Sequence, residues 1–372
     1  MPKLCSTQEC TGCAACFASC HHDAITMQKN NSGFLYPHIN YDKCIECKLC
    51  EKKCPIINDV LFYLPTTSIA CYNKDYKEQM QCASGGIGTL LATNIIAKGG
   101  IVYGCAFEPP FKFMHIRCNS YEDIQKIKNS KYVQSEITGV YSMLKNDLTS
   151  GKTVLFIGTP CQVAAIKSLF YLKYDNLFLV DIVCHGISSK QYLAETLPFN
   201  IIASDKKNIL FRNNSKYNFS ILNKQNQIIF ERPLECDMYM KGFFNGVSFR
   251  PSCHLCHFAK RERVSDLTIG DFWGVQSKKL KKRGSGISLV LTNTKKGINL
   301  FNDISNHIEM EERPIEEAYA GNEQLNHPFY DTIRAKIFRY VYKQNKYHTA
   351  LWFSIPDKIL AMKIKYYFKH NK

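Results

Sequence analysis

The sequence predicts two folded parts of different class: an α+β unit at the N-terminus, followed by an α/β unit with a mainly parallel sheet. Two observations predict this division. The first is a repeat of cysteines confined to residues 10–54. The second is an alternation of apolar strand patterns with helical patterns that begins near residue 66 and continues to about residue 325. With 372 residues, of which 45% are hydrophobic, the chain is long enough for two or three domains.

A run of four cysteines occurs twice near the N-terminus, and the second copy lies 34 residues after the first. Both runs have the spacing Cys-x2-Cys-x2-Cys-x3-Cys. In bacterial ferredoxins this spacing places three close cysteines on one 4Fe-4S cluster and the fourth on the other cluster. We therefore expect a ferredoxin-like twin-cluster domain over residues 1–62. The predicted ligands are Cys10, Cys13, Cys16 and Cys54 (the first ligand set) and Cys20, Cys44, Cys47 and Cys50 (the second ligand set).

Structural zinc is the alternative interpretation of these eight cysteines. Zinc ribbons pair two Cys-x2-Cys motifs across a long gap and do not need a third and a fourth cysteine at fixed intervals in each run. The spacing therefore favours iron–sulfur clusters. One position departs from the ferredoxin pattern, because His21 follows Cys20 where Pro55 follows Cys54.

The cysteine content also indicates the compartment. The chain has 18 cysteines, and its first residues, MPKLCSTQEC, lack the apolar stretch of a secretory signal. We expect a cytoplasmic protein, because thiolates in a reducing compartment bind metals instead of forming disulfides. No window of about 18 uninterrupted apolar residues predicts a membrane-spanning helix.

Four later cysteines lie where a ligand is expected. Cys161 follows the strand pattern TVLFIG, and Cys184 ends the strand pattern NLFLVDIV. The carboxyl ends of parallel strands share one edge of a sheet, and ligands bind at that edge. Cys253 and Cys256 form a Cys-x2-Cys pair, which is half of a metal site. The residues alone leave two interpretations open: a third four-thiolate site, or core thiols beside a small zinc knuckle.

The strand and helix patterns place the α/β domain over residues 66–325, with portions of about 66–145 and 150–325. A basic helical tail follows over residues 330–372. Residues 333–372 contain ten lysines and arginines and a single acidic residue, Asp357, in a chain of net charge +16. A solvated basic helix packed on the body is the favoured interpretation of this tail. Contact with an anionic membrane surface is the alternative.

Seven sequence blocks after residue 80 resemble a known family. They are SGGIGTLLA (84–92), NSKYVQS (129–135), LFIGTPCQVAAIK (155–167), DIVCHGISS (181–189), FRPSCHLCHFA (249–259), SDLTIGDFWG (265–274) and GISLVLTN (286–293). Together with the cysteine repeat, they resemble the beta subunits of coenzyme F420 hydrogenases and dehydrogenases, including bacterial relatives in polysaccharide gene clusters and a chlorophyll reductase. The resemblance spans nearly the whole chain.

This resemblance implies that the α/β unit is a flavin-binding domain that holds FAD and a third 4Fe-4S cluster. The implied ligands of that cluster are Cys161, Cys184, Cys253 and Cys256 (the third ligand set). The implied flavin-binding residues are Ser84, Gly85, Gly86, Asn129, Ser130, Lys131, Tyr132, Thr159 and Pro160. Without the family context, Ser84-Gly85-Gly86 reads as an ordinary helix start and Lys131 as a solvated side chain.

We therefore expect an iron–sulfur flavoprotein oxidoreductase that relays single electrons through 4Fe-4S clusters to FAD and on to, or from, an organic substrate. One alternative is an electron-transfer subunit for a separate catalytic partner. Another is a redox step on a nucleotide- or lipid-linked sugar in surface polysaccharide biosynthesis. The candidates for catalysis are His185 and Lys131, although a histidine such as His185 more often packs or hydrogen-bonds.

The expected partners follow from this interpretation. They are a ferredoxin-like donor or acceptor protein or a partner subunit, together with an organic substrate and no nucleic acid. We also consider a homo-oligomer, and peripheral contact of the basic tail with the inner face of the membrane.

Overall fold

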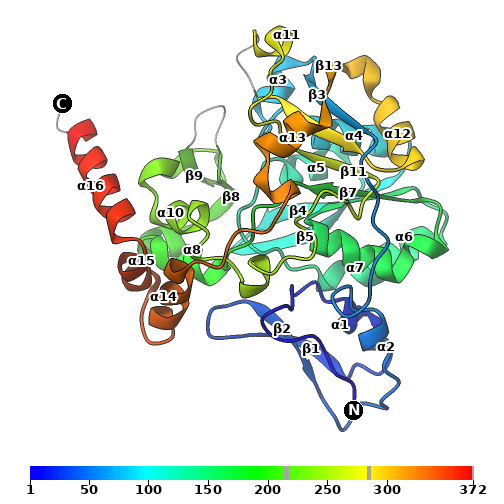
Figure 1. The fold of residues 1–372 in the computed structure, drawn as a ribbon, viewed down its shortest axis with the longest axis horizontal. Coiled ribbons are helices and arrows are strands. Elements are labelled where there is room, and N and C mark those ends of the chain that lie inside the picture. The colour runs from blue at the N-terminus through cyan, green and yellow to red at the C-terminus, as the bar shows by residue number, and fades with distance from the viewer. Residues whose placement is uncertain (213–217, 283–285, 371–372) are drawn as a thin grey trace.

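The computed structural model describes residues 1–212, 218–282 and 286–370. Asn371 and Lys372, the last residues of the predicted tail, lie outside the described residues. Figure 1 shows a central sheet with helices on both faces, an N-terminal unit beneath it, and the C-terminal helices packed on a smaller sheet to one side.

The N-terminal unit consists of α1 (Ala15–Ser19), β1 (Ile25–Lys29), β2 (Leu35–Ile39) and α2 (Leu49–Lys52). The strands β1 and β2 form an antiparallel hairpin, and each short helix lies inside one of the two cysteine runs. The residue before each helix has a left-handed backbone, with φ 60° at Ala14 and φ 57° at Lys48. The two runs therefore make the same local turn, as a duplicated motif should.

The large sheet has eight strands in the order β13-β3-β12-β11-β7-β6-β4-β5. Their bounds are β3 (Thr67–Asn73), β4 (Ile101–Glu108), β5 (Lys112–Cys118), β6 (Val154–Gly158), β7 (Leu177–Ile182), β11 (Leu267–Asp271), β12 (Ser288–Thr292) and β13 (Ile308–Arg313). Only the central strands β4, β6, β7 and β11 pair in parallel; the other pairings are antiparallel. The expected mainly parallel sheet is thus corrected to a mixed sheet with a parallel centre.

Helices cover both faces of this sheet because its central strands are apolar on both sides. In β6, Val154 and Phe156 pack on one face and Leu155 packs on the other. The first face carries α6 (Tyr141–Thr149) and α7 (Pro160–Phe170), and the second carries α4 (Ile87–Ala97), α5 (Tyr121–Ile127) and α12 (Lys295–Asn302). Shorter helices lie at the margins: α3 (Tyr76–Met80), α11 (Lys278–Lys281) and α13 (Ile315–Gly321).

A smaller unit combines a three-stranded antiparallel sheet, in the order β10-β9-β8, with the basic tail. Phe338, Tyr347, Leu351 and Ile359 of the tail are buried in the same core as the residues of this sheet. The elements are β8 (Lys206–Leu210), β9 (Asn218–Asn223), β10 (Ile228–Pro233), α8 (Lys190–Thr196), α9 (Phe199–Ala203), α10 (Met238–Phe244), α14 (Ile333–Tyr342), α15 (Tyr347–Ser354) and α16 (Pro356–His370). The tail is therefore part of a packed core.

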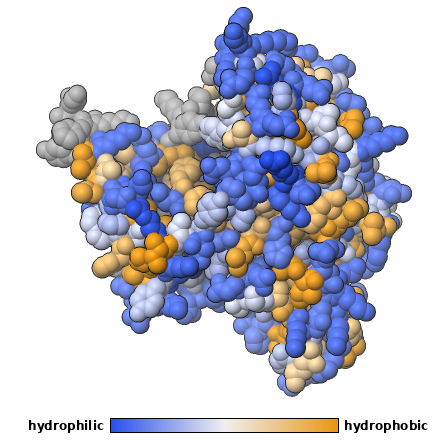
Figure 2. Space-filling model, viewed as in Figure 1, coloured by the Kyte–Doolittle hydropathy of each residue, from blue (hydrophilic) through white to orange (hydrophobic). Residues whose placement is uncertain are grey.

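The outer surface of these C-terminal helices is mixed in character. Tyr340 and Phe353 are exposed, and Lys336, Lys343 and Lys346 lie near them in the chain. Figure 2 shows hydrophobic and hydrophilic residues interspersed over this side of the molecule. Among the described helices, none has the length and apolarity needed to cross a membrane.

Candidate functional site

A cavity of about 300 Å³ lies at the carboxyl ends of the parallel strands. Its floor is formed by Gly104 and Cys105 of β4 and by the residues that end β6, β7 and β11. Thr159 follows β6, Cys184 follows β7, and Asp271 is the last residue of β11. This is the edge where ligands bind in open α/β sheets. We call this space the sheet-edge cavity.

Most of the predicted flavin-binding residues line the sheet-edge cavity. Two do not. The N–H of Gly85 donates to Ser288 Oγ at 2.9 Å beneath the cavity wall, and Pro160 lines the neighbouring cavity. The predicted residues that do line the sheet-edge cavity are Ser84, Gly86, Asn129, Ser130, Lys131, Tyr132 and Thr159.

The N-terminus of α4 borders the sheet-edge cavity. The helix starts after Gly86, whose φ of 83° is favourable only for a residue without a side chain, and no side chain caps this end. Gly86, Ile87, Gly88 and Thr89 all line the cavity. The first N–H groups of a helix lack intrahelical partners, and the helix dipole favours negative charge there. This end of α4 is therefore suited to an anionic group.

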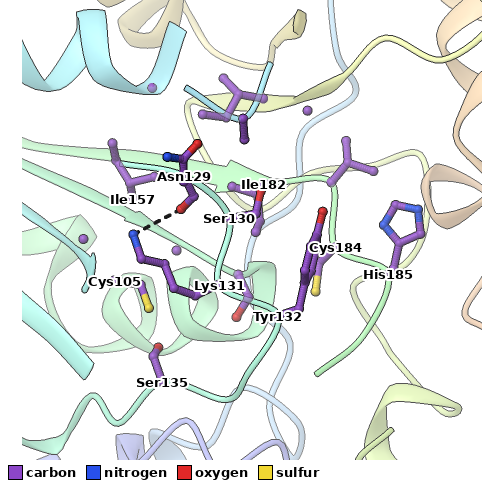
Figure 3. A pocket seen from close by; sticks show the side chains of 18 of the residues that line it. Cys105, Asn129, Ser130, Lys131, Tyr132, Ser135, Ile157, Ile182, Cys184 and His185 are labelled. Carbon is purple, nitrogen blue, oxygen red and sulfur yellow. Dashed lines mark hydrogen bonds between the residues drawn. The ribbon is translucent and has the colours of Figure 1, made fainter. Parts of the chain in front are cut away.

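Two lysines line this cavity; Lys128 pairs with Glu78, whereas Lys131 has backbone partners. The ammonium group of Lys131 donates to the carbonyl oxygens of Lys126 at 3.1 Å and Asn129 at 3.2 Å, and also to that of Lys128. Figure 3 shows the side chain folded back toward Asn129, with Cys105 beside it. Burial lowers the pKa of Lys131 to about 8. The group is thus mostly charged at neutral pH but close to titration.

The second candidate for catalysis, His185, lies next to Cys184 in the wall of the same cavity (Figure 3). Desolvation by the surrounding protein lowers its pKa below the ordinary value for histidine. Its imidazole is therefore mainly neutral at pH 7.

A second histidine, His115, belongs to a hydrogen-bonded chain in the wall of the same cavity. His115 Nδ1 lies 2.9 Å from Ser135 Oγ, and Gln162 Nε2 donates to the same hydroxyl at 2.9 Å. Gln162 in turn accepts from the backbone N–H of Thr159 at 3.2 Å. Burial lowers the pKa of His115 to about 4. This chain fixes the turn between β6 and α7, and Cys161 lies in the first turn of that helix.

The four cysteines of the third ligand set come together in a smaller cavity. Cys161, Cys184, Cys253 and Cys256 all line it, and Cys161 and Cys184 also line the sheet-edge cavity. The backbone N–H of Ile187 donates to Cys253 Sγ at 3.4 Å. Burial raises the pKa of the Cys256 thiol to about 11. Metal binding to this set would therefore release protons.

The first ligand set also gathers in space. The thiols of Cys13 and Cys16 interact electrostatically with each other and with that of Cys54. Cys16 interacts with the Cys10 thiol as well. Burial raises the pKa of Cys13 to about 12.

The second ligand set lines a small cavity at the tip of the N-terminal unit. Cys20, Cys44, Cys47 and Cys50 all contribute to it, and Cys47 is exposed. Within residues 1–212, 218–282 and 286–370, no three or more His, Cys, Asp and Glu side chains are grouped closely enough for a single metal ion. A 4Fe-4S cluster differs in that its thiolates bind separate corners of a larger group.

Comparisons with known proteins assign both parts of the chain. Residues 9–56 match the model of the 4Fe-4S dicluster domain. Residues 151–318 match the model for the C-terminal part of the beta subunit of coenzyme F420 hydrogenase/dehydrogenase. Residues 151–318 therefore carry the C-terminal domain of the coenzyme F420 hydrogenase/dehydrogenase beta subunits, and a 4Fe-4S dicluster domain precedes it. The predicted family and the predicted dicluster domain are thereby confirmed.

Other comparisons add little to this assignment. A chain of the F420-reducing [NiFe] hydrogenase complex from Methanosarcina barkeri is similar at 17% identity, with 83% of this chain and 95% of that chain covered and a TM-score of 0.48. At that score we draw no structural conclusion from it. No curated protein matches the sequence.

Some residues at these sites were not predicted from the sequence. Cys5, which belongs to neither cysteine run, lies within hydrogen-bond reach of Cys10 and Cys54 in the first ligand set. Cys105, Phe243 and Trp273 line the sheet-edge cavity. The position of Cys5, five residues before Cys10, could have marked it as a neighbour of the first ligand set. Cys105, Phe243 and Trp273 lie in separate segments that only the fold brings together.

Proposed function

We propose that the protein is an iron–sulfur flavoprotein oxidoreductase that passes single electrons along three 4Fe-4S sites to or from a flavin in the sheet-edge cavity, and from there to or from an organic substrate. The observation that carries this proposal is that the three ligand sets lie in series between an exposed cysteine and that cavity.

The series begins at Cys47, the exposed member of the second ligand set. Cys16 of the first set packs in the same small core as Cys20, Cys44 and Cys50 of the second. On its other side the first set meets the third, because Cys13 belongs to a core against which Cys161 and Cys256 pack.

The series ends at the sheet-edge cavity, whose wall contains Cys161 and Cys184 of the third set. Single-electron carriers placed in this order support a relay between the protein surface and the cavity. A bound flavin would supply the link between one-electron carriers and two-electron organic chemistry.

The residues around the cavity fit a flavin. Apolar walls, the ammonium group of Lys131 and the uncapped start of α4 offer an aromatic ring system and an anionic tail complementary surroundings. Lys131 and the first N–H groups of α4 would bind the anionic part of the cofactor. Tyr132 and Ile182 would exclude water from the ring (Figure 3).

A second candidate function is electron transfer to a separate catalytic protein. The volume of about 300 Å³ is at the low end for ligand pockets. A flavin in this space would leave little room for a bulky substrate beside it. A protein partner, in contrast, needs no such room.

The proposed route is tested by removing its outer end. In a Cys44→Ser/Cys47→Ser double variant, reduction of the bound flavin by reduced ferredoxin should fall at least about tenfold, because the outer carrier is lost. Reduction by dithionite, which is small enough to reach other sites, should remain. The control is Cys236→Ser, because Cys236 lies outside the three ligand sets.

Stopped-flow absorbance of the flavin provides the measurement. Unchanged reduction by ferredoxin in the double variant would contradict a route that starts at the second ligand set. Reoxidation of the reduced protein by small organic acceptors would support an enzyme, whereas reoxidation by a protein alone would support the second candidate.

A further inference from the structure

Arg250 is completely buried between the N-terminal unit and the α/β domain. Its guanidinium donates to the carbonyl oxygens of Cys10 at 2.7 Å and Leu35 at 2.9 Å, and to Gln134 Oε1 at 3.2 Å. It also lies over the ring of Tyr36, 4.1 Å from the ring centroid. Each of these acceptors is neutral.

No ion pair of Arg250 occurs among the residues that the structure describes. Arg263 is buried to the same degree, since both arginines rank among the largest fully buried side chains, but it has a counter-ion. Arg263 donates to the carboxylate of Asp181 at 2.9 Å. A buried charge without a counter-ion is strongly unfavourable, so such groups are normally paired. Arg250 therefore requires a negative partner of another kind.

The nearest anionic candidates are thiolates. The charge of Arg250 acts electrostatically on Cys10 of the first ligand set and on Cys161 and Cys253 of the third. A cluster held by four thiolates is anionic, and it gains one further negative charge on reduction. Arg250 thus lies where two such groups would share it.

We propose that Arg250 is the shared counter-cation of the first and third 4Fe-4S clusters and raises the reduction potential of both. The proposal rests on the relay proposed above, although its first-cluster half needs only the 4Fe-4S dicluster domain. A buried positive charge stabilises the reduced, more negative form of a cluster more than the oxidised form. Arg250 is a positioning residue in this sense and takes no part in bond chemistry.

Two substitutions cancel the positive charge in different ways. Arg250→Gln deletes it. Gln134→Glu is nearly isosteric and supplies the missing carboxylate 3.2 Å from the guanidinium. Arg250→Lys keeps the charge but changes the hydrogen-bonding group. Arg117→Gln is the control, because Arg117 already pairs with Asp147 at 2.7 Å.

The measurement is an anaerobic redox titration followed by electron paramagnetic resonance, with iron counted in every sample. We expect Arg250→Gln and Gln134→Glu to weaken cluster reduction about tenfold, a shift of about 59 mV to lower potential for one electron. Arg250→Lys and Arg117→Gln should stay near the wild-type potential.

Wild-type potentials in both charge-cancelling variants, at wild-type iron content, would overturn the proposal. If Arg250→Gln does not fold, Gln134→Glu decides alone. If the wild-type protein holds only the two clusters of the N-terminal domain, the relay as proposed fails, but the potential of the first cluster still tests Arg250. The two failures are therefore distinguishable.

Discussion

At the scale of single residues, the site depends on charges held where water is excluded. The ammonium group of Lys131 donates to backbone carbonyl oxygens, and the guanidinium of Arg250 likewise donates to neutral acceptors. The sequence predicted Lys131 only through family resemblance, because a lysine in an isolated segment is usually solvated. Arg250 was not predicted at all, since its contacts join Cys10, Leu35 and Gln134, which are far apart in the chain.

The lowered pKa of Lys131 predicts a pH-dependent affinity for FAD. In the free protein the ammonium form predominates below about pH 8 and the neutral amine above it. An anionic ligand that needs the ammonium form should therefore bind about tenfold more weakly for each pH unit above that value. Fluorescence titration of flavin-free protein with FAD from pH 7 to 9.5 measures this.

Two substitutions control this experiment. Lys131→Met should bind FAD weakly and lose the pH dependence. Lys126→Met removes an exposed lysine five positions earlier and should keep both the affinity and its dependence on pH. A pH profile of Lys131→Met identical to the wild type would show that another group is responsible.

At the scale of elements, the turn between α3 and α4 sets the position of the cavity wall. Gly85 packs so tightly that a Cβ atom there would lie 2.5 Å from the carbonyl oxygen of Cys71 and 2.9 Å from the N atom of Ser288. The glycines before α4 were predictable as a helix start, and so was the turn from β6 into α7. The contact between Gly85 and β12 was not, because it depends on strand pairing across more than 200 residues.

Gly85→Ala should lower the free energy of unfolding by about 1–3 kcal/mol, the usual effect of overpacking. The added methyl group meets backbone atoms that cannot move independently of the sheet. FAD affinity should fall as well, because the start of α4 shifts. Thermal and denaturant unfolding measure the first effect.

The matched control is Gly139→Ala, since a Cβ atom there meets nothing within 4 Å. Equal stability of the two alanine variants would contradict the packing described for Gly85.

At the scale of the whole molecule, the N-terminal unit is tied to the α/β domain by hydrogen bonds to backbone oxygens. Lys53 Nζ donates to the carbonyl oxygen of Ser168 at 2.9 Å, and Ser168 Oγ donates back to that of Lys53 at 3.0 Å. Lys167 Nζ reaches the carbonyl oxygen of Leu61 at 2.6 Å. These contacts keep the first and third ligand sets adjacent.

The sequence predicted the order and fold class of these units better than the pairing of the strands within them. Cysteine spacing identified the N-terminal domain, and strand–helix alternation identified the parallel centre of the sheet. The antiparallel pairing of the outer strands β3, β12 and β13 was not predicted, because strands distant in sequence pair according to the whole fold and not to local pattern. Strand order predicted Cys161 and Cys184 at the ligand-binding edge, whereas only the assembled fold shows that Cys253 and Cys256 line the same small cavity.

The most direct test of a three-site relay ending at a flavin is to count iron, sulfide and flavin in protein purified without oxygen. The wild type should contain about twelve irons per chain, four for each cluster, and one FAD. A Cys161→Ser/Cys253→Ser variant should retain about eight irons, whereas Cys236→Ser should match the wild type. Protein that contained zinc in place of iron and no flavin would contradict the account.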